Sequence, residues 1–323
     1  MRHLRDKGRS LRLGGLDQSN RDQVGLMPKE GWRQRNYQFF RNIVIPSMFT
    51  KRTGDPRLDT TRRVGDDQIF VTWIGHATFL VQMHGVNILI DPNWALWHSI
   101  FKRVRRPGIA LQELPPIDLI MVSHAHYDHL HLRSLAEIAN GQPILMPRGV
   151  SPLVRRLDLE PVEMDWWDNI EVNGVKITFT PARHWGARYV HDLHRGFGGF
   201  TLTIGNRTLY HCGDSAYFEG FKEIGSRFDI SLALMPIGGY DAPSGRTVHM
   251  NPEEALDAFL DLQADTMIPM HYGSFPLGGE PMHEPLERLI YKAGSEGLSH
   301  RVRILEEGVS ALIKRKPSMR RAG

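Results

Sequence analysis

Apolar residues gather in short, strand-like segments from Gln68 onward. The first two, IFVTWIGHATFLVQM and VNILIDP, are separated by His84 and Gly85, a pair typical of a tight turn, and predict a β-hairpin. The run IDLIMVS then predicts a buried strand, and DHLHLRSLAEIANG has the spacing of a helix that stops at Gly141. A strand followed directly by a helix is typical of an α/β fold.

The same alternation continues toward the C-terminus. Further strands are predicted for VKITFTPAR, GGFTLTIGNRTLYHCGD, FDISLALMPIG and DTMIPM, and NPEEALDAFLDL predicts a helix with Asn251 as N-cap and Pro252 at its first position. This strand-rich texture occurs on both sides of about residue 165. Continuous apolar strands between amphipathic helices predict two sheets, each covered by helices on one face and packed together by the other.

The beginning of the chain has a different texture. Residues 1–66 are polar and basic, apart from the stretch YQFFRNIVIPSMF, which we expect to form a helix or an arm packed on the body. We therefore divide the chain into a basic N-terminal extension (1–66), a main domain (67–313) and a basic tail (314–323). No apolar run reaches the roughly 20 residues of a membrane span, so we expect no integral membrane protein. The start MRHLRDKGRS lacks the apolar segment of a secretory signal, so we expect a cytoplasmic protein.

The composition limits which side chains could hold a metal and which partners the charge could attract. Hydrophobic residues make up 41% and charged residues 24% of the 323 positions, as in soluble globular proteins. The single cysteine, Cys212, can form neither an intrachain disulfide nor a thiolate cluster, so imidazole and carboxylate would have to hold any metal. The net charge is +4, and cations concentrate at both ends of the chain. Such a fringe is compatible with nucleic acid, with anionic lipid headgroups, or with a merely solvated surface.

The most specific pattern is HAHYDH at residues 124–129, directly after the predicted strand IDLIMVS. His124 and His126 are two positions apart and can project to the same side of an extended loop. Asp128 and His129 are expected to turn onto the start of the helix and face a second position. One metal would not readily use all four side chains, whereas two metals could divide them, and this donor set suits Zn²⁺, Mn²⁺ or Fe.

Further ligands must come from other parts of the chain. Three candidates follow predicted strands: His184 after VKITFTPAR, Asp214 after RTLYHCG, and His271 after DTMIPM. Each alone is more typical of a structural residue. Their shared placement at strand ends makes them candidate ligands, because binding residues concentrate in the loops that a rigid sheet positions.

These motifs resemble those of the metallo-β-lactamase superfamily of metallohydrolases. Longer stretches are similar to the N-acyl-phosphatidylethanolamine-hydrolysing phospholipase D family and its bacterial relatives, among them TWIGHATFLVQM, RRPGIALQELPPIDLIMVSHAHYDHL, FTPARHW, GDSAYF, HMNPEEA and MHYGSF. The resemblance implies an α/β fold (α+β in some schemes), a four-layer αββα sandwich with a two-metal site on one edge of its sheets.

The resemblance also implies roles for individual residues. One metal would be held by His124, His126 and His184, and the other by Asp128, His129 and His271, with Asp214 bridging the two. Both ions are expected to be zinc, with manganese and iron as alternatives. Catalysis would involve Asp128, Asp214 and His249, with water activated by the metals as the nucleophile.

Other residues near these motifs have two interpretations each. Asp91 would orient a ligand imidazole, or form a turn before Pro92. His76 matches the family pattern near the site, and a core histidine explains it nearly as well. His249 would donate a proton to the leaving group or hold a phosphate oxygen, or serve the local structure before the helix. Tyr127 and Tyr272 lie beside ligands, and we expect them to contact substrate.

The predicted function is that of a binuclear phosphodiesterase acting on an N-acyl-phosphatidylethanolamine-like phospholipid. The alternatives are a lactonase or carboxylic-ester hydrolase, a nuclease, and a non-enzymatic binding protein. We expect a phospholipid or small-molecule partner, and no nucleic acid because no nucleic-acid module is recognised. Peripheral contact with an anionic membrane and a homo-oligomer are both compatible with the sequence. The chain departs from the family pattern at His131 and Asn251, where Asp is common, and at Tyr272-Gly273-Ser274, where Trp-Gly-Thr is common.

Overall fold

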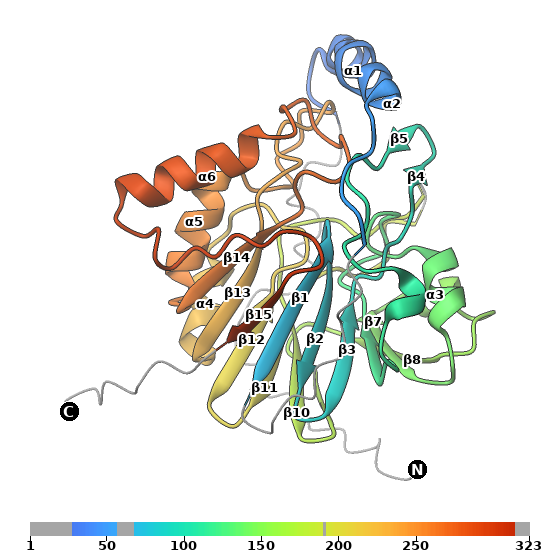
Figure 1. Ribbon diagram of the computed structural model, residues 1–323, viewed down its shortest axis with the longest axis vertical. Coiled ribbons are helices and arrows are strands. Elements are labelled where there is room, and N and C mark those ends of the chain that lie inside the picture. Colours follow the sequence, from blue (N-terminus) through green and yellow to red (C-terminus); the bar gives the residue numbers. More distant parts are fainter. Residues whose placement is uncertain (1–27, 57–67, 190–191, 314–323) are drawn as a thin grey trace.

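The computed structural model describes residues 28–56, 68–189 and 192–313 (Figure 1). The predicted basic tail and the boundary placed after residue 66 fall outside these described residues, so the division into three parts stays a prediction. Within the described ranges no helix combines the length and the apolar character that crossing a bilayer would require.

The first sheet has seven strands in the order β15-β1-β2-β3-β6-β7-β8. Their bounds are β1 (Ile69–Gly75), β2 (Thr78–Met83), β3 (Val86–Ile90), β6 (Leu119–Met121), β7 (Pro143–Pro147), β8 (Glu160–Met164) and β15 (Ser310–Ile313). Strands β15 to β3 pair antiparallel, whereas β3, β6, β7 and β8 run parallel. The predicted hairpin at His84 and Gly85 is confirmed as the β2–β3 connection.

The second sheet has six strands in the order β14-β13-β12-β11-β10-β9. Their bounds are β9 (Asn169–Val172), β10 (Val175–Thr180), β11 (Gly199–Ile204), β12 (Arg207–His211), β13 (Ile230–Pro236) and β14 (Thr266–Met270). The strands on the two sides of residue 165 therefore build two different sheets, apart from β15, which returns to the first. A two-stranded ribbon, β4 (Trp97–His98) and β5 (Phe101–Lys102), lies outside both.

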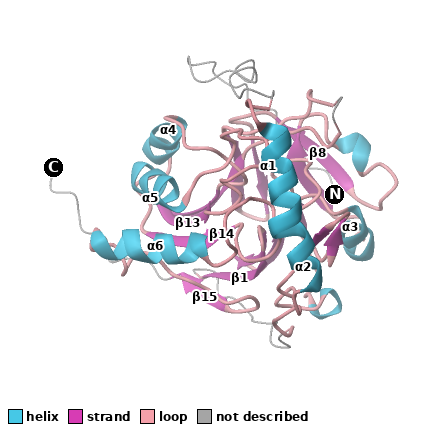
Figure 2. Cartoon of the chain, turned by 90° about the horizontal axis from the view of Figure 1, so that it is seen from above, coloured by secondary structure: helices cyan, strands magenta, loops and turns pink. Residues whose placement is uncertain are grey.

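The two sheets pack face to face and helices cover their outer faces (Figures 1 and 2). Strand β6 illustrates the alternation: Leu119 and Met121 join the core between the sheets, whereas Ile120 packs on the other side with Leu135 of α3 (Leu132–Ile138). Helices α4 (Gly220–Arg227), α5 (Pro252–Asp261) and α6 (Glu284–Ser295) cover the second sheet. The predicted four-layer αββα sandwich is confirmed. Two short 3₁₀ turns, η3 (Leu111–Glu113) and η4 (Ser151–Leu153), lie in its connections.

The apolar stretch of the N-terminal extension is helical. It forms α1 (Trp32–Phe39), a π-helical turn η2 (Phe40–Val44) and α2 (Ile45–Phe49). Arg35 donates to the carbonyl of Pro243 at 3.3 Å, and the Lys102 ammonium donates to the carbonyl of Met48 at 2.9 Å. The segment therefore packs across the 241–245 loop and the β4–β5 ribbon.

One expected element begins later than its sequence pattern indicates. The helix predicted from Asp128 starts at Leu132, because His131 is its N-cap and accepts a hydrogen bond from the Ser134 amide. Before it, the amides of His129 and Leu130 both bond to the His126 carbonyl and form a turn. The whole HAHYDH motif consequently lies in the loop after β6, and the helix ends at Ile138 rather than at Gly141.

Candidate metal centre

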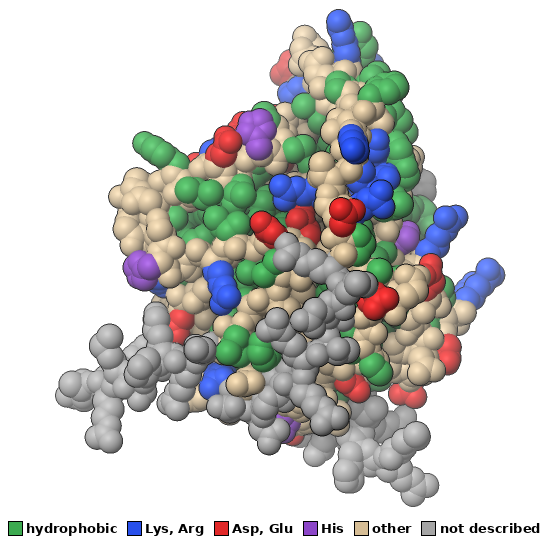
Figure 3. All heavy atoms as spheres, viewed as in Figure 1, with side chains coloured by type: hydrophobic (Ala, Val, Ile, Leu, Met, Phe, Trp, Pro, Cys, Tyr) green, Lys and Arg blue, Asp and Glu red, His purple; other side chains and the backbone are tan. Residues whose placement is uncertain are grey.

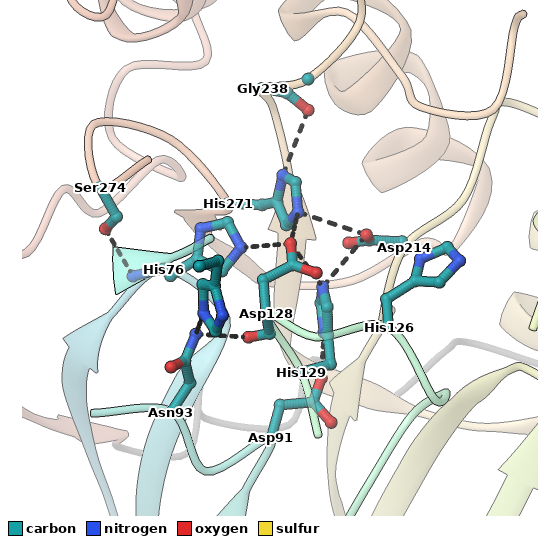
Figure 4. A network of polar contacts seen from close by, with 12 residues as sticks. His76, Asp91, Asn93, His126, Asp128, His129, Asp214, Gly238, His271 and Ser274 are labelled. Carbon is teal, nitrogen blue, oxygen red and sulfur yellow. Dashed lines mark hydrogen bonds and ion pairs between the residues drawn. The ribbon is translucent and has the colours of Figure 1, made fainter. Parts of the chain in front are cut away.

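The candidate ligands meet where several strands of both sheets end. The β6–α3 loop carries four of them, and each other ligand follows a strand: His184 after β10, Asp214 after β12 and His271 after β14. His76 follows β1. Side chains from segments almost 200 residues apart thus face one another at one edge of the sandwich (Figure 4).

The first cluster, called here the His124 group, contains His124, His126, His184 and Asp214. The His124 Nε2 and His126 Nδ1 atoms are 2.8 Å apart, and His184 Nε2 is 3.3 Å from the same His126 nitrogen. The group offers ligand atoms that all lie within 4.8 Å of one another. Three imidazoles and a carboxylate at this spacing could hold one divalent transition-metal ion.

The second cluster, called here the His271 group, contains His76, Asp128, His129 and His271. The Asp128 Oδ2 atom lies 2.9 Å from His76 Nε2, 3.5 Å from His271 Nε2 and 3.7 Å from His129 Nε2. This arrangement differs from the predicted set by including His76, whose nitrogen is the nearest to the carboxylate (Figure 4).

Asp214 lies between the two groups. Its Oδ2 atom is 3.1 Å from His129 Nε2 and 3.2 Å from His271 Nε2 in one group, and 3.7 Å from His124 Nε2 in the other. The carboxylate is almost fully buried. Its position agrees with the bridging role that the resemblance implies.

Hydrogen bonds on the outer side fix how the imidazoles point. His184 Nδ1 lies 2.9 Å from the Val248 carbonyl oxygen, and His271 Nδ1 lies 3.3 Å from that of Gly238. Because a carbonyl can only accept, each Nδ1 carries a proton, and each Nε2 faces the cluster. His126 is arranged differently and turns Nδ1 toward the other ligands.

Asp91 supports the centre from beneath. Its carboxylate accepts hydrogen bonds from the Ser123 amide and hydroxyl, both at 2.7 Å, and its Oδ2 atom is 2.7 Å from His129 Nδ1. These contacts favour a role for Asp91 in orienting a ligand imidazole over a role only in the turn before Pro92. Asp91, His76 and His271 all have left-handed backbone, with φ of 44°, 57° and 60°. Non-glycine residues in that region are strained, as is frequent at functional sites.

Several polar atoms of the centre are buried without a hydrogen-bond partner in the described part of the chain. They include Nε2 of His129, Nε2 of His271 and Oδ1 of Asp214. Buried polar atoms are nearly always satisfied, so these call for a partner that is not a side chain. Lone pairs of neutral imidazoles and of carboxylates aimed at common points are the donor set of Zn²⁺ and similar ions. The residues present therefore fit a pair of divalent cations.

The pKa shifts of the buried side chains differ across the centre. Burial lowers the pKa of His184 to about 3 and that of His126 to about 4, and holds the pKa of His124 well below its usual value. Burial acts in the same direction on His271, but Asp214 and Asp128 outweigh it and raise the pKa of His271 to about 9. The positive side chains around Asp214 overcome its burial in turn, and its pKa lies well below the usual range.

The predicted substrate residues lie at different depths. His249 is half-buried, and its Nδ1 atom lies 3.8 Å from Asp214 Oδ2, beside both groups. Tyr127 is exposed at the rim, with Arg188 over its ring. Tyr272 is buried and stacked on Trp73 at a ring separation of 5.1 Å. Contact of these three residues with substrate stays a prediction.

Two residues that support the HAHYDH loop belong to none of the sequence motifs. The Asn93 amide donates to the Asp128 carbonyl at 2.8 Å, and Arg188 donates to the carbonyls of Ala125 and Leu130, both at 2.9 Å. Together they fix the two sides of the HAHYDH loop. Asn93 lies two residues beyond Asp91, and only this position after β3 could have indicated from the sequence that it belongs to the centre.

The departures from the family pattern have structural explanations. His131 and Asn251 are both helix N-caps, and Asn251 forms a complete capping box with Glu254. Burial lowers the pKa of His131 to about 4, so its imidazole stays a neutral acceptor where Asp would serve equally. Ser274 accepts a hydrogen bond from the His76 amide at 2.9 Å, which a threonine hydroxyl could also do. None of these side chains needs to contact substrate.

A model of the β-lactamase superfamily domain matches residues 86–272. The chain belongs to this superfamily. N-acyl-phosphatidylethanolamine-hydrolyzing phospholipase D 1 of Caenorhabditis elegans is 34% identical over 244 residues, which cover 68% of each chain. An uncharacterised protein of Mycobacterium tuberculosis is 32% identical over 243 residues, 71% of this chain; the match covers 65% of that relative's length, slightly under two thirds.

Solved structures support the same assignment. A metallo hydrolase from the archaeon Ignicoccus hospitalis aligns over 77% of this chain and its own entire length, with a TM-score of 0.60 and 25% identity. The chain therefore shares the superfamily fold with this metallo hydrolase, and its candidate ligands lie at the edge of the two sheets.

Proposed function

We propose that this hydrolase is a two-metal phosphodiesterase of the phospholipase D type, acting on an N-acyl-phosphatidylethanolamine-like lipid. The observation that carries the proposal is the position of Asp214, whose Oδ2 atom lies within 4 Å of imidazoles from both donor groups. Two-metal sites suit the in-line displacement of a phosphodiester because they stabilise both the attacking and the leaving oxygen. The named nematode relative supports the substrate class.

The metal-binding roles follow the two donor groups, except that His76 is not counted as a ligand. His124, His126 and His184 would hold one cation, Asp128, His129 and His271 the other, and Asp214 both. Zinc suits these donors best, with manganese and iron as alternatives. When bound, the cations supply an activated water and positive charge at the phosphoryl oxygens.

The surrounding side chains position the reactants. Asp128 and Asp214 carry the negative charge that balances two dications, and the outward bonds of His184 and His271 turn their Nε2 atoms toward the cluster. Burial lowers the pKa of His249 to about 3, so its imidazole is neutral. A neutral imidazole donates one hydrogen bond, which assigns His249 to holding a substrate oxygen rather than to delivering a proton from an imidazolium.

A mixed apolar and basic surface supports a lipid substrate. Helix α2, which carries exposed Phe49 and Ile45, contacts β5 of the ribbon that also carries exposed Trp97 and Ile100. The basic Lys51 follows α2 in the chain. Phe49 is 84% exposed. Figure 3 shows basic and hydrophobic side chains together on this upper part of the molecule. Aromatic residues next to cations match the requirements of an anionic bilayer surface, so we propose peripheral docking here.

Product analysis tests the substrate assignment. Zinc-loaded protein is incubated with N-acyl-phosphatidylethanolamine, and the products are identified by mass spectrometry. We expect N-acylethanolamine and phosphatidate, formed about 100- to 1000-fold more slowly by His126→Ala and not at all after removal of metal by a chelator. If the lipid survives while a lactone or a simple carboxylic ester is cleaved, the phosphodiesterase assignment is wrong.

Vesicle binding tests the proposed membrane contact. Sedimentation with phosphatidylglycerol vesicles should recover the wild-type protein, and Phe49→Ser should reduce the bound fraction several-fold. Tyr291→Ser is the matched control, because Tyr291 is 79% exposed on α6, away from this surface. Equal binding of both variants would contradict the docking surface.

A further inference from the structure

Three arginines lie near the metal centre, and two of them bind backbone carbonyls. Arg103 is buried, and its Nε and Nη1 atoms donate to the carbonyls of Arg105 and Asn93, both at 2.9 Å. Arg188 donates to two carbonyls of the HAHYDH loop. Both guanidinium groups therefore hold backbone in place, although Nη2 of Arg103 and Nε of Arg188 are buried without a hydrogen-bond partner in the described residues.

The guanidinium group of the third arginine, Arg246, binds no backbone carbonyl of the described residues. Its Nε atom is buried, and within the described residues it has no hydrogen-bond partner. Its guanidinium carbon lies 5.0 Å from the centre of the Trp185 ring, a cation–π contact that fixes the side chain without using its N–H donors. Burial lowers the pKa of Arg246, but an arginine stays charged at neutral pH.

The position of this pair relates it to the centre. Trp185 follows His184 in the chain, and its ring meets the His126 ring edge-on at 4.6 Å. Arg246 lies two residues before Val248, whose carbonyl orients His184, and three before His249. A single indole ring thus separates an uncompensated positive charge from the His124 group.

We propose that Arg246, held on Trp185, is an anion subsite that binds a charged phosphoryl oxygen of the substrate. For the class of its ligand this inference rests on the proposed function. A phosphodiester carries one negative charge, and the planar guanidinium presents paired donors that match two phosphoryl oxygens. The subsite would favour anionic phosphodiesters over uncharged esters, which the metal centre alone does not distinguish.

The test compares Arg246→Gln with wild type on two substrates that share a leaving group. These are bis(p-nitrophenyl) phosphate, which is anionic, and p-nitrophenyl acetate, which is uncharged. We expect the ratio of their kcat/KM values to shift about 10- to 100-fold against the diester, and Arg246→Lys to recover part of it. Calorimetric titration with inorganic phosphate should show a Kd weakened by a similar factor, at unchanged metal content.

Arg227→Gln is the matched control. The Arg227 guanidinium also lies over a tryptophan, 4.0 Å from the Trp167 ring centre, but it pairs with Glu223 at 2.7 Å. Both substrates and phosphate should respond to this variant as to wild type. An equal loss on both substrates in Arg246→Gln, or an unchanged ratio and phosphate Kd, would overturn the anion subsite.

The outcomes separate this inference from the proposed function. If wild-type protein cleaves no phosphodiester but Arg246→Gln still weakens phosphate binding, the subsite stands and the phosphodiesterase assignment fails. If wild type cleaves N-acyl-phosphatidylethanolamine while Arg246→Gln changes neither the ratio nor the phosphate Kd, the function stands and the subsite is rejected.

Discussion

The two donor groups of the metal centre differ in their charge. The His124 group has three imidazoles, and burial lowers the pKa of each, so all are neutral at pH 7. The His271 group has its own carboxylate, Asp128, and the carboxylates around it raise the pKa of His271 to about 9 despite burial. A positive charge is therefore favoured more strongly at the second group, where proton and metal ion compete for the same nitrogens.

The two cations would therefore be held by different means. Imidazole lone pairs dominate at the first group, whereas carboxylate charge contributes more at the second. Asp214 is common to both, because its Oδ2 atom approaches imidazoles of each. Substitutions that remove the shared residue, one member of one group, or a supporting residue should consequently have decreasing effects.

The largest effect is expected from Asp214→Ala. The variant removes the carboxylate that neutralises both sites and leaves the buried imidazoles without it, so metal content should fall from two ions per chain to less than one. Losing several kcal/mol of stabilisation should lower kcat/KM by about 1000-fold or more. Metal is measured by mass spectrometry after dialysis, alongside the rate.

The matched control is Asp229→Asn, an exposed carboxylate between α4 and β13. It should keep both ions and full activity. Retention of two tightly bound ions by Asp214→Ala would show that the two groups do not share a ligand.

One-sided substitutions should remove one ion each. We compare His126→Ala with His271→Gly, where glycine is chosen because residue 271 has φ of 60° and a Cβ there adds strain. Each variant should retain about one ion and lose about 100- to 1000-fold in kcat/KM. Metal content of the two variants, and of the double variant, is the measurement. Loss of both ions from either single variant would mean that the groups bind cooperatively rather than separately.

The positions of the candidate ligands along the chain explain how much of the site the sequence could predict. Four of the candidate ligands lie within the six residues of HAHYDH, so their spacing alone indicated a metal site, and the apolar strand before them indicated the sheet edge. His184, Asp214 and His271 are scattered over almost 90 residues. Strand-end placement marked them as candidates, and the family resemblance assigned them to particular metals.

Other features depend on tertiary contacts that no local pattern contains. The start of α3 at Leu132 follows from the turn around His126 and the cap at His131, whereas the polar spacing of DHLHLRS suggested an earlier start. Arg188 and Arg246 look alike in the sequence, yet Arg188 binds two backbone carbonyls, whereas the Arg246 guanidinium lies over the Trp185 ring. Which of them is available to a ligand could be seen only in three dimensions.

A smaller, one-sided effect is expected from Asp91→Asn. An amide in place of the carboxylate weakens the bond to His129 Nδ1 and the pair of bonds from Ser123. Loss of such an outer partner typically costs about 10- to 100-fold in metal affinity or activity. Competition with a chromophoric chelator should show weaker binding of one ion and little change for the other. Equal weakening of both ions would contradict an action through His129.

The smallest effect is expected from His76→Asn, and it bears on the composition of the His271 group. Of the imidazole nitrogens in the group, His76 Nε2 lies nearest to the Asp128 carboxylate, and its distance of 2.9 Å to Oδ2 is that of a hydrogen bond. Asparagine suits the left-handed backbone at this position, where φ is 57°. If His76 only orients Asp128, the variant should bind two ions at saturating zinc, with affinity for one of them about 10-fold lower. If the variant instead binds a single ion at saturation, His76 is itself a ligand, and the second group has one more imidazole than the superfamily resemblance implies.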